Sequence, residues 1–307
     1  MQIKEYSFPS ATGVCEIHGN VYTPDDGQVD AVLALHHGMA EHQERYRNFV
    51  EYLTSNHIAV YFSDMANHGA SNQNFEHTGF FGDKDGYKEL VHDFRTVFDM
   101  ARNDYPDKRI VVMGHSMGSF IVRCFAAWFA NECDYEKAIF MGTGGANPLA
   151  EIGNGLSSLI SRTKGKYYKS KTLDSLTFGS YNSKFEGRTN FDWLTRDNDI
   201  VDKYINDKYC GFLFSAQGMN DLVKINIASN SKEWYDKLPK DRAYLVISGE
   251  MDPVGEYGKA VKGVYDKLIQ TGHSKAELKL YPECRHEVLN ELNKDEVYND
   301  VKDFILK

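Results

Sequence analysis

One serine of this sequence stands where a reactive nucleophile could be built. The segment Gly114-His115-Ser116-Met117-Gly118 has the pattern G-x-S-x-G and lies directly between an apolar run and a helix-like stretch. In a tight turn from strand to helix, the central serine adopts a strained backbone conformation and is presented at the edge of a sheet. The spacing alone often arises by chance, so its placement is what matters. The pattern predicts acyl transfer with Ser116 as the nucleophile.

A serine hydroxyl needs a general base at neutral pH. Among the eleven histidines, His286 follows the last predicted strand and precedes the last predicted helix. The base belongs at this place when nucleophile, acid and base follow one another along the chain. We therefore expect His286 to accept the serine proton. The other histidines considered lie inside the serine motif or in earlier loops, namely His115, His36, His37, His42 and His68.

The acid that orients this histidine is expected between the serine and the base. Asp252 follows the apolar run 243–247 and a glycine turn at Gly249. A buried carboxylate there would hold the imidazole in its productive tautomer and stabilise the imidazolium as it forms. Glu250 is the nearest rival, with a longer and less rigid side chain, and Asp64 precedes the serine in the chain. The sequence favours Asp252.

A second loop is expected to stabilise the negative charge of the reaction. His37-Gly38-Met39 follows the apolar run 31–35. In a site of this kind, one backbone N–H of such a loop and the N–H after the nucleophile bind the oxyanion. These are the N–H groups of Met39 and Met117, and Gly38 would let the loop approach the substrate closely. The alternative is an ordinary glycine-containing turn at the end of a strand.

These residues need a sheet that brings distant segments to one edge. Alternating polar and apolar residues over 3–8 and 14–22, on either side of Thr12-Gly13, predict an antiparallel pair. Continuous apolar runs then alternate with helix-like stretches, as expected for buried parallel strands joined by helices. The predicted strands cover 31–35, 58–62, 110–113, 138–141, 243–247 and 277–281, and the predicted helices 46–55, 87–105, 120–130, 257–271 and a final stretch to 304. The sequence predicts an α/β fold with a mostly parallel central sheet flanked by helices.

The rhythm of strands and helices breaks between about residues 147 and 237, where Ser, Gly, Asn, Tyr and Lys are frequent. We expect a core domain of residues 1–146 and 238–307, interrupted by a cap or lid over 147–237. Apolar residues at helical spacing between Ala150 and Ile160 indicate an amphipathic helix in this cap. Such a helix could line an acyl-chain tunnel, touch a membrane surface transiently, or pack on the core.

Taken together, these segments resemble the monoacylglycerol lipase and lysophospholipase branch of the α/β-hydrolases, which is grouped with serine aminopeptidases of the S33 type. The similar segments are His37-Gly38-Met39-Ala40-Glu41-His42 with Arg45-Tyr46, residues 64–71 except for a missing Arg near Ala66, residues 114–118 and 249–254, His286-Glu287, and 178–182, 193–197 and 210–212 in the cap. The resemblance implies the α/β-hydrolase fold with an inserted cap. It also implies that His37, Gly38, Glu41 and Arg45 position the oxyanion loop, with Glu41 paired to Arg45. An exposed pair would contribute little energy, so its role would be positional.

Composition and charge narrow the class of protein. The formal net charge of −9 should repel phosphate backbones, so no nucleic-acid partner is expected. The first residues do not read as a signal peptide, and no run approaches the ~20 apolar residues of a membrane span. Five cysteines without a Cys-x-x-Cys spacing argue against a disulfide framework and a zinc site. A cytoplasmic location is the simplest interpretation.

The expected function is hydrolysis of a carboxylic ester through an acyl-enzyme, without a metal or other cofactor. The small-molecule substrate is a monoacylglycerol, a lysophospholipid or another single-chain ester. Two enzymatic alternatives stay open, a short-chain or aryl esterase and an S33-type aminopeptidase, whose amine site would need acidic cap residues such as Glu151, Glu186 or Asp192. A non-catalytic binding protein on a hydrolase scaffold is the alternative from a different class. The sequence does not predict an oligomeric state.

Overall fold

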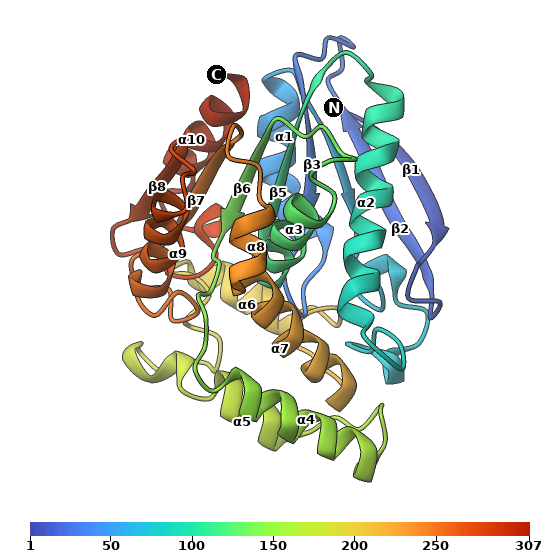
Figure 1. Cartoon of the computed structure of the whole chain (residues 1–307), viewed down its shortest axis with the longest axis vertical. Coiled ribbons are helices and arrows are strands. Elements are labelled where there is room, and N and C mark those ends of the chain that lie inside the picture. The colour runs from blue at the N-terminus through green and yellow to red at the C-terminus, as the bar shows by residue number, and fades with distance from the viewer.

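One eight-stranded sheet forms the centre of the molecule, and the computed structural model describes all 307 residues around it (Figure 1). The strand order is β1-β2-β4-β3-β5-β6-β7-β8, with β1–β2 and β2–β4 antiparallel and every other neighbouring pair parallel. The strands are β1 (Gln2–Pro9), β2 (Glu16–Thr23), β3 (Ala31–His36), β4 (Ile58–Ser63), β5 (Arg109–His115), β6 (Lys137–Met141), β7 (Ala243–Gly249) and β8 (Ala276–Tyr281). The predicted α/β-hydrolase fold, with an antiparallel start and a mostly parallel sheet, is confirmed.

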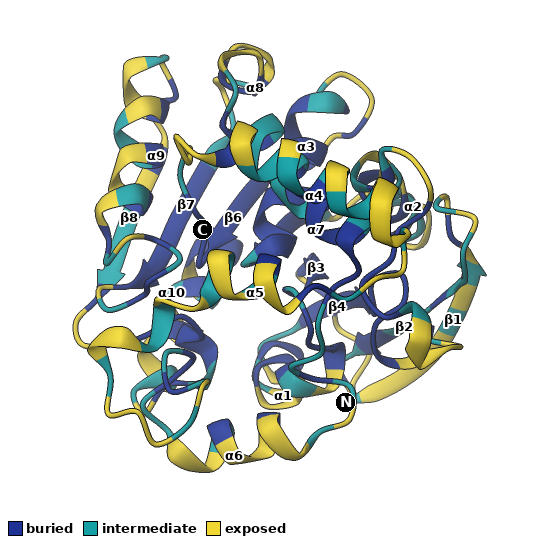
Figure 2. Cartoon of the chain, turned by 90° about the horizontal axis from the view of Figure 1, so that it is seen from below, coloured by how far each residue is buried: buried dark blue, intermediate teal, exposed yellow.

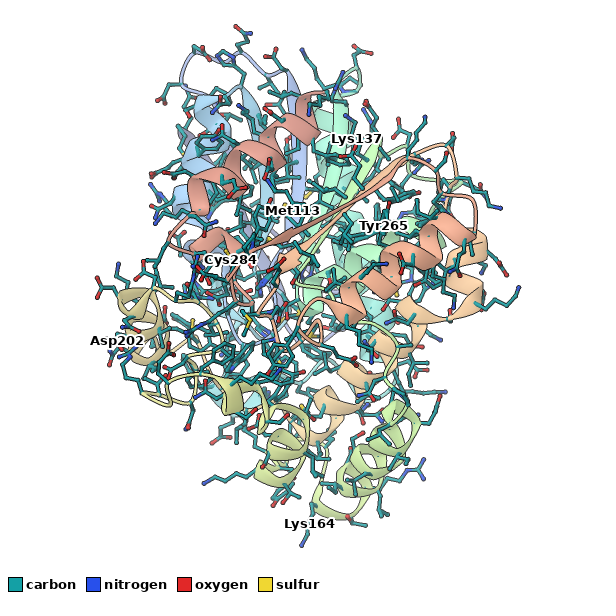
Figure 3. The ribbon with its side chains drawn as sticks, turned by 90° about the vertical axis from the view of Figure 1, so that its left-hand side faces the viewer. Met113, Lys137, Lys164, Asp202, Tyr265 and Cys284 are labelled. Carbon is teal, nitrogen blue, oxygen red and sulfur yellow. The ribbon has the colours of Figure 1, made fainter.

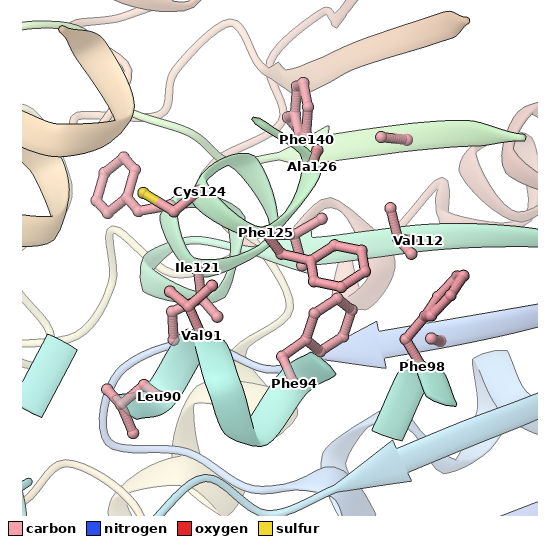
Figure 4. Close-up of a cluster of buried hydrophobic side chains, with 14 of the residues drawn as sticks. Leu90, Val91, Phe94, Phe98, Val112, Ile121, Cys124, Phe125, Ala126 and Phe140 are labelled. Carbon is pink, nitrogen blue, oxygen red and sulfur yellow. The ribbon is translucent and has the colours of Figure 1, made fainter. Parts of the chain in front are cut away.

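Helices cover both faces of this sheet and bury its apolar strands. Every residue of β3 and β4 is buried, as a continuous apolar run requires when both faces are covered. The flanking helices of the core are α1 (Arg47–Ser55), α2 (Gly86–Asp104), α3 (Met117–Trp128), α9 (Lys259–Gln270) and α10 (Lys294–Leu306). Side chains of α1 and α10 form one hydrophobic cluster with the sheet, and those of α2, α3 and α9 form the other. In the second cluster, the ring of Phe125 packs edge-on against Phe94, with 5.1 Å between ring centroids (Figure 4).

The long segment between β6 and β7 contains five further helices. They are α4 (Ala150–Lys164), α5 (Lys171–Phe178), α6 (Asn198–Asn206), α7 (Ala216–Asn230) and α8 (Lys232–Lys237). Helices α4 and α5 form a layer beyond the end of the sheet, opposite the chain termini (Figure 1). Lys164 lies at the far tip of this layer (Figure 3). The outer surfaces of α4 and α5 are largely exposed, whereas α7 lies beneath α4 against the core (Figure 2).

Several predicted boundaries were wrong by two or three residues, and the helix predicted over 120–130 covers Met117–Trp128. The helix expected from residue 257 begins at Lys259, because Glu256, Tyr257 and Gly258 have φ values of 51°, 56° and 84°. Consecutive left-handed residues cannot form the first turn of a right-handed helix. The strand expected from residue 14 begins at Glu16, because residues 10–15 form a turn closed by the Ser10 N–H and the Cys15 carbonyl. No helix combines the length and apolar character needed to cross a membrane.

The segment between β6 and β7 is here called the inserted segment. A fully buried arginine, Arg123, links both of its ends to the core. Arg123 of α3 donates from Nη1 to Thr143 Oγ1 and the Gly144 carbonyl, at 3.2 and 3.1 Å. Its Nη2 donates to the Ser229 carbonyl and Asn230 Oδ1, at 2.5 and 3.0 Å. Its guanidinium also lies 4.4 Å from the centroid of a buried tryptophan ring, that of Trp234. A single side chain thus holds the loop that leaves β6 and the end of α7.

Replacement of this arginine should destabilise the protein. Arg123→Met leaves four buried acceptors without their donor, and each unpaired group costs about 1–3 kcal/mol, partly offset because a buried charge is removed. We expect a loss of about 3 kcal/mol in the free energy of unfolding, measured by urea denaturation. Arg162→Met, at an exposed position of α4, is the matched control. A loss no larger than that of the control would contradict this account.

Candidate active site

Ser116 occupies a sharp turn between β5 and α3. Its backbone has φ 52° and ψ −121°, and its N–H donates to the Met141 carbonyl at 2.9 Å. Both flanking glycines are required by close backbone contacts. A Cβ on Gly114 would lie 2.2 Å from the Gly118 carbonyl oxygen, and a Cβ on Gly118 would lie 2.3 Å from the His37 carbonyl oxygen. The strand–turn–helix setting that the sequence pattern predicted is therefore present.

The predicted base and acid are in direct contact. His286 Nδ1 lies 3.0 Å from Asp252 Oδ1, and both side chains are buried. Asp252 also accepts hydrogen bonds from the Ser248 hydroxyl at 2.7 Å and the Val254 N–H at 2.9 Å. A carboxylate held in this way accepts the Nδ1 proton, which leaves Nε2 of His286 available as a proton acceptor. His286 and Ser116 line the same pocket.

The loop over residues 37–46, here called the oxyanion loop, passes close to the serine. A Cβ on Gly38 would lie 3.0 Å from the Cβ of Ser116 and 2.8 Å from Glu41 Oε1, so a larger residue would not fit. The N–H groups of Met39 and Met117 have no acceptor within the protein. Both residues line the pocket. Two free N–H donors beside Ser116 are what an oxyanion site would require if this serine is the nucleophile.

The buried carboxylate of Glu41 holds the oxyanion loop in place through hydrogen bonds. Its Oε1 accepts hydrogen bonds from the Gly38 N–H at 2.6 Å and the Tyr46 hydroxyl at 2.7 Å, and lies 3.0 Å from His115 Nδ1. Burial alone would raise the pKa of Glu41, but the hydrogen bond and charge of His115 and the charge of Arg45 lower it well below its usual value. Burial likewise disfavours the charged form of His115, yet Glu41 outweighs it and the pKa of His115 is raised.

Arg45 joins the oxyanion loop to the loop that carries the base. Its Nη1 donates to Glu41 Oε2 at 2.7 Å, and Nη1 and Nη2 donate to the two carboxylate oxygens of Glu287 at 2.6 Å each. The pair of Glu41 and Arg45 was expected to be exposed, but both side chains are buried, because Tyr204 of α6 covers the guanidinium at 4.7 Å. Sequence reasoning missed the role of Glu287, whose only signal is its position directly after His286.

The other histidines of this region form hydrogen bonds with backbone groups of the loops. His37 accepts the Met65 N–H at Nε2, at 2.8 Å, and its Nδ1 lies 2.8 Å from the Gly38 carbonyl. His68 accepts the Ala40 N–H at 3.2 Å. Burial lowers the pKa of His36, His37 and His68 to about 3, so these rings are neutral and poorly suited to act as bases.

A pocket of about 880 Å³ opens above Ser116 and His286. Of its 43 lining residues, 22 are hydrophobic and none is a lysine or arginine. The ring of Trp193 packs 5.1 Å from that of His286. Among the lining residues between β6 and β7, the exposed large hydrophobic side chains are those of Leu149, Ile152 and Leu176.

The acidic residues considered for an amine site do not converge in this pocket. Glu151, Glu186 and Asp192 are absent from its lining. Glu186 instead pairs with Arg285 at 2.7 Å, and Asp192 accepts the Thr189 hydroxyl at 2.6 Å. These three carboxylates therefore do not form the site that an aminopeptidase would need.

Known proteins resemble this chain over nearly its whole length. A monoacylglycerol lipase of Mycolicibacterium smegmatis is 28% identical over 302 residues, covering 98% of this chain and 96% of that protein. A monoglyceride lipase of Homo sapiens is 24% identical over 288 residues, covering 91% and 82%. The crystal structure of a thermostable carboxyl esterase from Bacillus coagulans, in complex with glycerol, superposes with a TM-score of 0.92 at 28% identity and covers 100% of both chains.

The family comparison agrees with the fold. Residues 27–293 match the family described as serine aminopeptidase, S33 (Hydrolase_4), so the match spans most of the chain. The chain therefore belongs to the Hydrolase_4 family of α/β-hydrolases, within its esterase and monoacylglycerol lipase branch.

Proposed function

We propose that this protein hydrolyses single-chain carboxylic esters, monoacylglycerols above all, with Ser116, His286 and Asp252 as its catalytic residues. The observation that carries the proposal is the common pocket of Ser116 and His286, whose lining is half apolar and contains no lysine or arginine. An acyl chain fits such a lining. A lysophospholipid fits less well, because its phosphate would meet no lysine or arginine.

The proposed reaction proceeds through an acyl-enzyme. His286 Nε2 takes the proton of the Ser116 hydroxyl while the oxygen attacks the ester carbonyl. The N–H groups of Met39 and Met117 bind the oxyanion, each lowering the barrier by on the order of ~3 kcal/mol. His286 then gives its proton to the leaving alcohol, and a water molecule, deprotonated by the same ring, releases the fatty acid. His37, Gly38, Glu41 and Arg45 position the loop that supplies Met39.

We further propose that residues 147–237 act as a cap over this pocket. Leu149, Ile152 and Leu176 are 65%, 68% and 69% exposed and lie at the mouth. Exposed apolar side chains beside an apolar pocket are suited to transient contact with a lipid surface, from which a single-chain substrate can pass inward.

The relatives support this substrate class. The Mycolicibacterium smegmatis protein of nearly equal length is a monoacylglycerol lipase, and glycerol, the alcohol released from a monoacylglycerol, is bound in the Bacillus coagulans esterase. A short-chain esterase has no need for a pocket of about 880 Å³. Support for an aminopeptidase is weak, because Glu151, Glu186 and Asp192 lie outside the pocket and Asp174 is the one acidic residue of segment 147–237 that lines it.

Ser116→Ala should abolish the reaction, because no other group can form the acyl-enzyme. We expect hydrolysis of 1-monooleoylglycerol and of a nitrophenyl ester to fall to background, together with labelling by a fluorophosphonate probe. Ser55→Ala, at an exposed helix end, is the control and should keep both. Retained turnover in Ser116→Ala would remove the assignment of the nucleophile, and failure of the unaltered protein to react with the probe would favour a non-catalytic binding protein.

Glu41→Gln tests the positioning role of the buried carboxylate. The amide can still accept the Gly38 N–H, but it loses the charge that faces Arg45 and His115. Because small displacements of an oxyanion donor are costly, we expect kcat for a nitrophenyl ester to fall about 100-fold with little change in KM. Glu44→Gln, exposed in the same loop, should leave both constants unchanged. Equal kinetics for the two variants would refute the positioning role.

The mouth of the pocket should matter only for long substrates. In the double variant Ile152→Asp with Leu176→Asp, two charges replace apolar groups that would meet the acyl chain or the lipid surface. We expect turnover of monooleoylglycerol in micelles to fall at least tenfold while turnover of nitrophenyl butyrate changes less than twofold. Leu292→Asp, equally exposed but outside the pocket, is the control. An equal loss on both substrates would argue against the proposed cap function.

A further inference from the structure

Three side chains with metal-binding atoms meet where the oxyanion loop contacts the inserted segment. His42 Nε2 lies 2.7 Å from Asp207 Oδ2. One ring nitrogen of His42, one carboxylate oxygen of Asp207 and the Cys210 sulfur all lie within 4.8 Å of one another. His42 and Cys210 are buried, whereas Asp207 is partly exposed, so the cluster has one side open to solvent. We propose that His42, Asp207 and Cys210 form a zinc-binding site, separate from the catalytic pocket.

The ligand set favours zinc among the common metal ions. Imidazole, thiolate and carboxylate are the protein ligands of Zn²⁺, whereas Ca²⁺ and Mg²⁺ prefer oxygen ligands alone. Bond lengths of about 2.0–2.3 Å around a tetrahedral ion place ligand atoms roughly 3.3–3.8 Å apart. The 2.7 Å distance between His42 Nε2 and Asp207 Oδ2 would have to lengthen slightly. Small side-chain rotations would bring the Cys210 sulfur to bonding distance from the ion. Water on the open side would supply the fourth ligand.

The thiol of Cys210 is the strongest single indication. It makes no hydrogen bond within the protein, although a buried sulfur beside a carboxylate and an imidazole has donors and acceptors close by. Asp207 is held in orientation from its other oxygen, Oδ1, which accepts the Tyr209 N–H at 2.8 Å. The ring of Tyr209 packs edge-on against that of His42, with 5.8 Å between centroids. These contacts orient two of the three ligands before any ion arrives.

Zinc binding must release the proton of the thiol. The thiol gives its proton to solvent as the sulfur–zinc bond forms, and His42 Nε2, which faces Asp207 Oδ2, must carry no proton when it binds the ion. Burial raises the pKa of the Cys210 thiol, an effect that the charge of Arg45 partly opposes. Arg45 itself would repel the ion, but its charge is already shared by the carboxylates of Glu41 and Glu287.

The proposed zinc site lies between the oxyanion loop and the inserted segment. His42 is three residues after Met39, which lines the pocket and supplies one of the proposed oxyanion donors. On the other side, the Gly211 N–H donates to the Ala40 carbonyl at 3.0 Å, and the Tyr204 hydroxyl donates to the same carbonyl at 3.1 Å. An ion bound by His42, Asp207 and Cys210 would add a further connection between the oxyanion loop and the inserted segment. Zinc would therefore stabilise the folded protein. No local pattern in the sequence indicates this site, because His42 lies 165 residues before Asp207 in the chain.

Cobalt substitution tests the proposal without reference to activity. Co²⁺ is added to the full-length protein after treatment with a chelator, and the near-ultraviolet absorption of a cobalt–thiolate bond is recorded. We expect one equivalent of Co²⁺ to give this band and Zn²⁺ to abolish it. Cys210→Ser should lose the band completely, and Asp207→Asn, which keeps the contact with His42, should bind at least tenfold more weakly. Cys15→Ser, at another free cysteine, is the control and should match the unaltered protein.

Thermal unfolding provides the second measurement. Zn²⁺ should raise the unfolding midpoint of the unaltered protein and of Cys15→Ser, but not that of Cys210→Ser. Absence of the cobalt–thiolate band, or its survival in Cys210→Ser, would overturn the proposal. So would a loss of the band in Cys15→Ser, since the thiolate ligand would then lie elsewhere. None of these results depends on whether the protein hydrolyses monoacylglycerols.

Discussion

The buried ion pairs of Arg45 fix the geometry on which the rest of the site depends. Strand pairing sets the positions of Ser116, Asp252 and His286, but the oxyanion loop leaves the sheet after β3 and has no strand partner of its own. Arg45 holds that loop through Glu41 and the base loop through Glu287. A buried cation between two carboxylates is stable only while all partners are present, since loss of one leaves a charge without compensation. The two loops are therefore kept in a single relative arrangement.

The order of the strands in the sheet positions Ser116, Asp252 and His286. Ser116 follows β5, Asp252 follows β7 and His286 follows β8, so three segments distant in sequence reach the same edge of a parallel sheet. Close backbone packing at this edge explains why glycine recurs there. A Cβ on Gly142, after β6, would lie 3.1 Å from ring atoms of both His115 and His286. The edge is thus crowded by backbone and rings that leave little freedom to the residues proposed for catalysis.

Much of the core could be predicted from sequence because its signals are local. Buried strands appear as continuous apolar runs, and chain order led to Asp252 and His286, which the structure brings within 3.0 Å. The inserted helices were largely missed. Helices α5 and α6 have only 8 and 9 residues, and α7 lies between α4 and the core, so no single apolar stripe marks it. Contacts such as Arg45 with Glu287 join residues 242 positions apart, and no spacing rule reveals them.

The anchoring of the inserted segment by Arg123 bears on how such segments can be exchanged between related enzymes. The guanidinium grips the chain at Thr143 and Gly144 on one side and at Ser229 and Asn230 on the other. A chimera whose junctions lie between Gly144 and Ser229 would keep both sets of hydrogen bonds. A segment from another enzyme could then be inserted without disturbing them. Junctions placed outside these positions would separate Arg123 from the acceptors of its hydrogen bonds. The buried guanidinium would then face carbonyl groups that come from another protein.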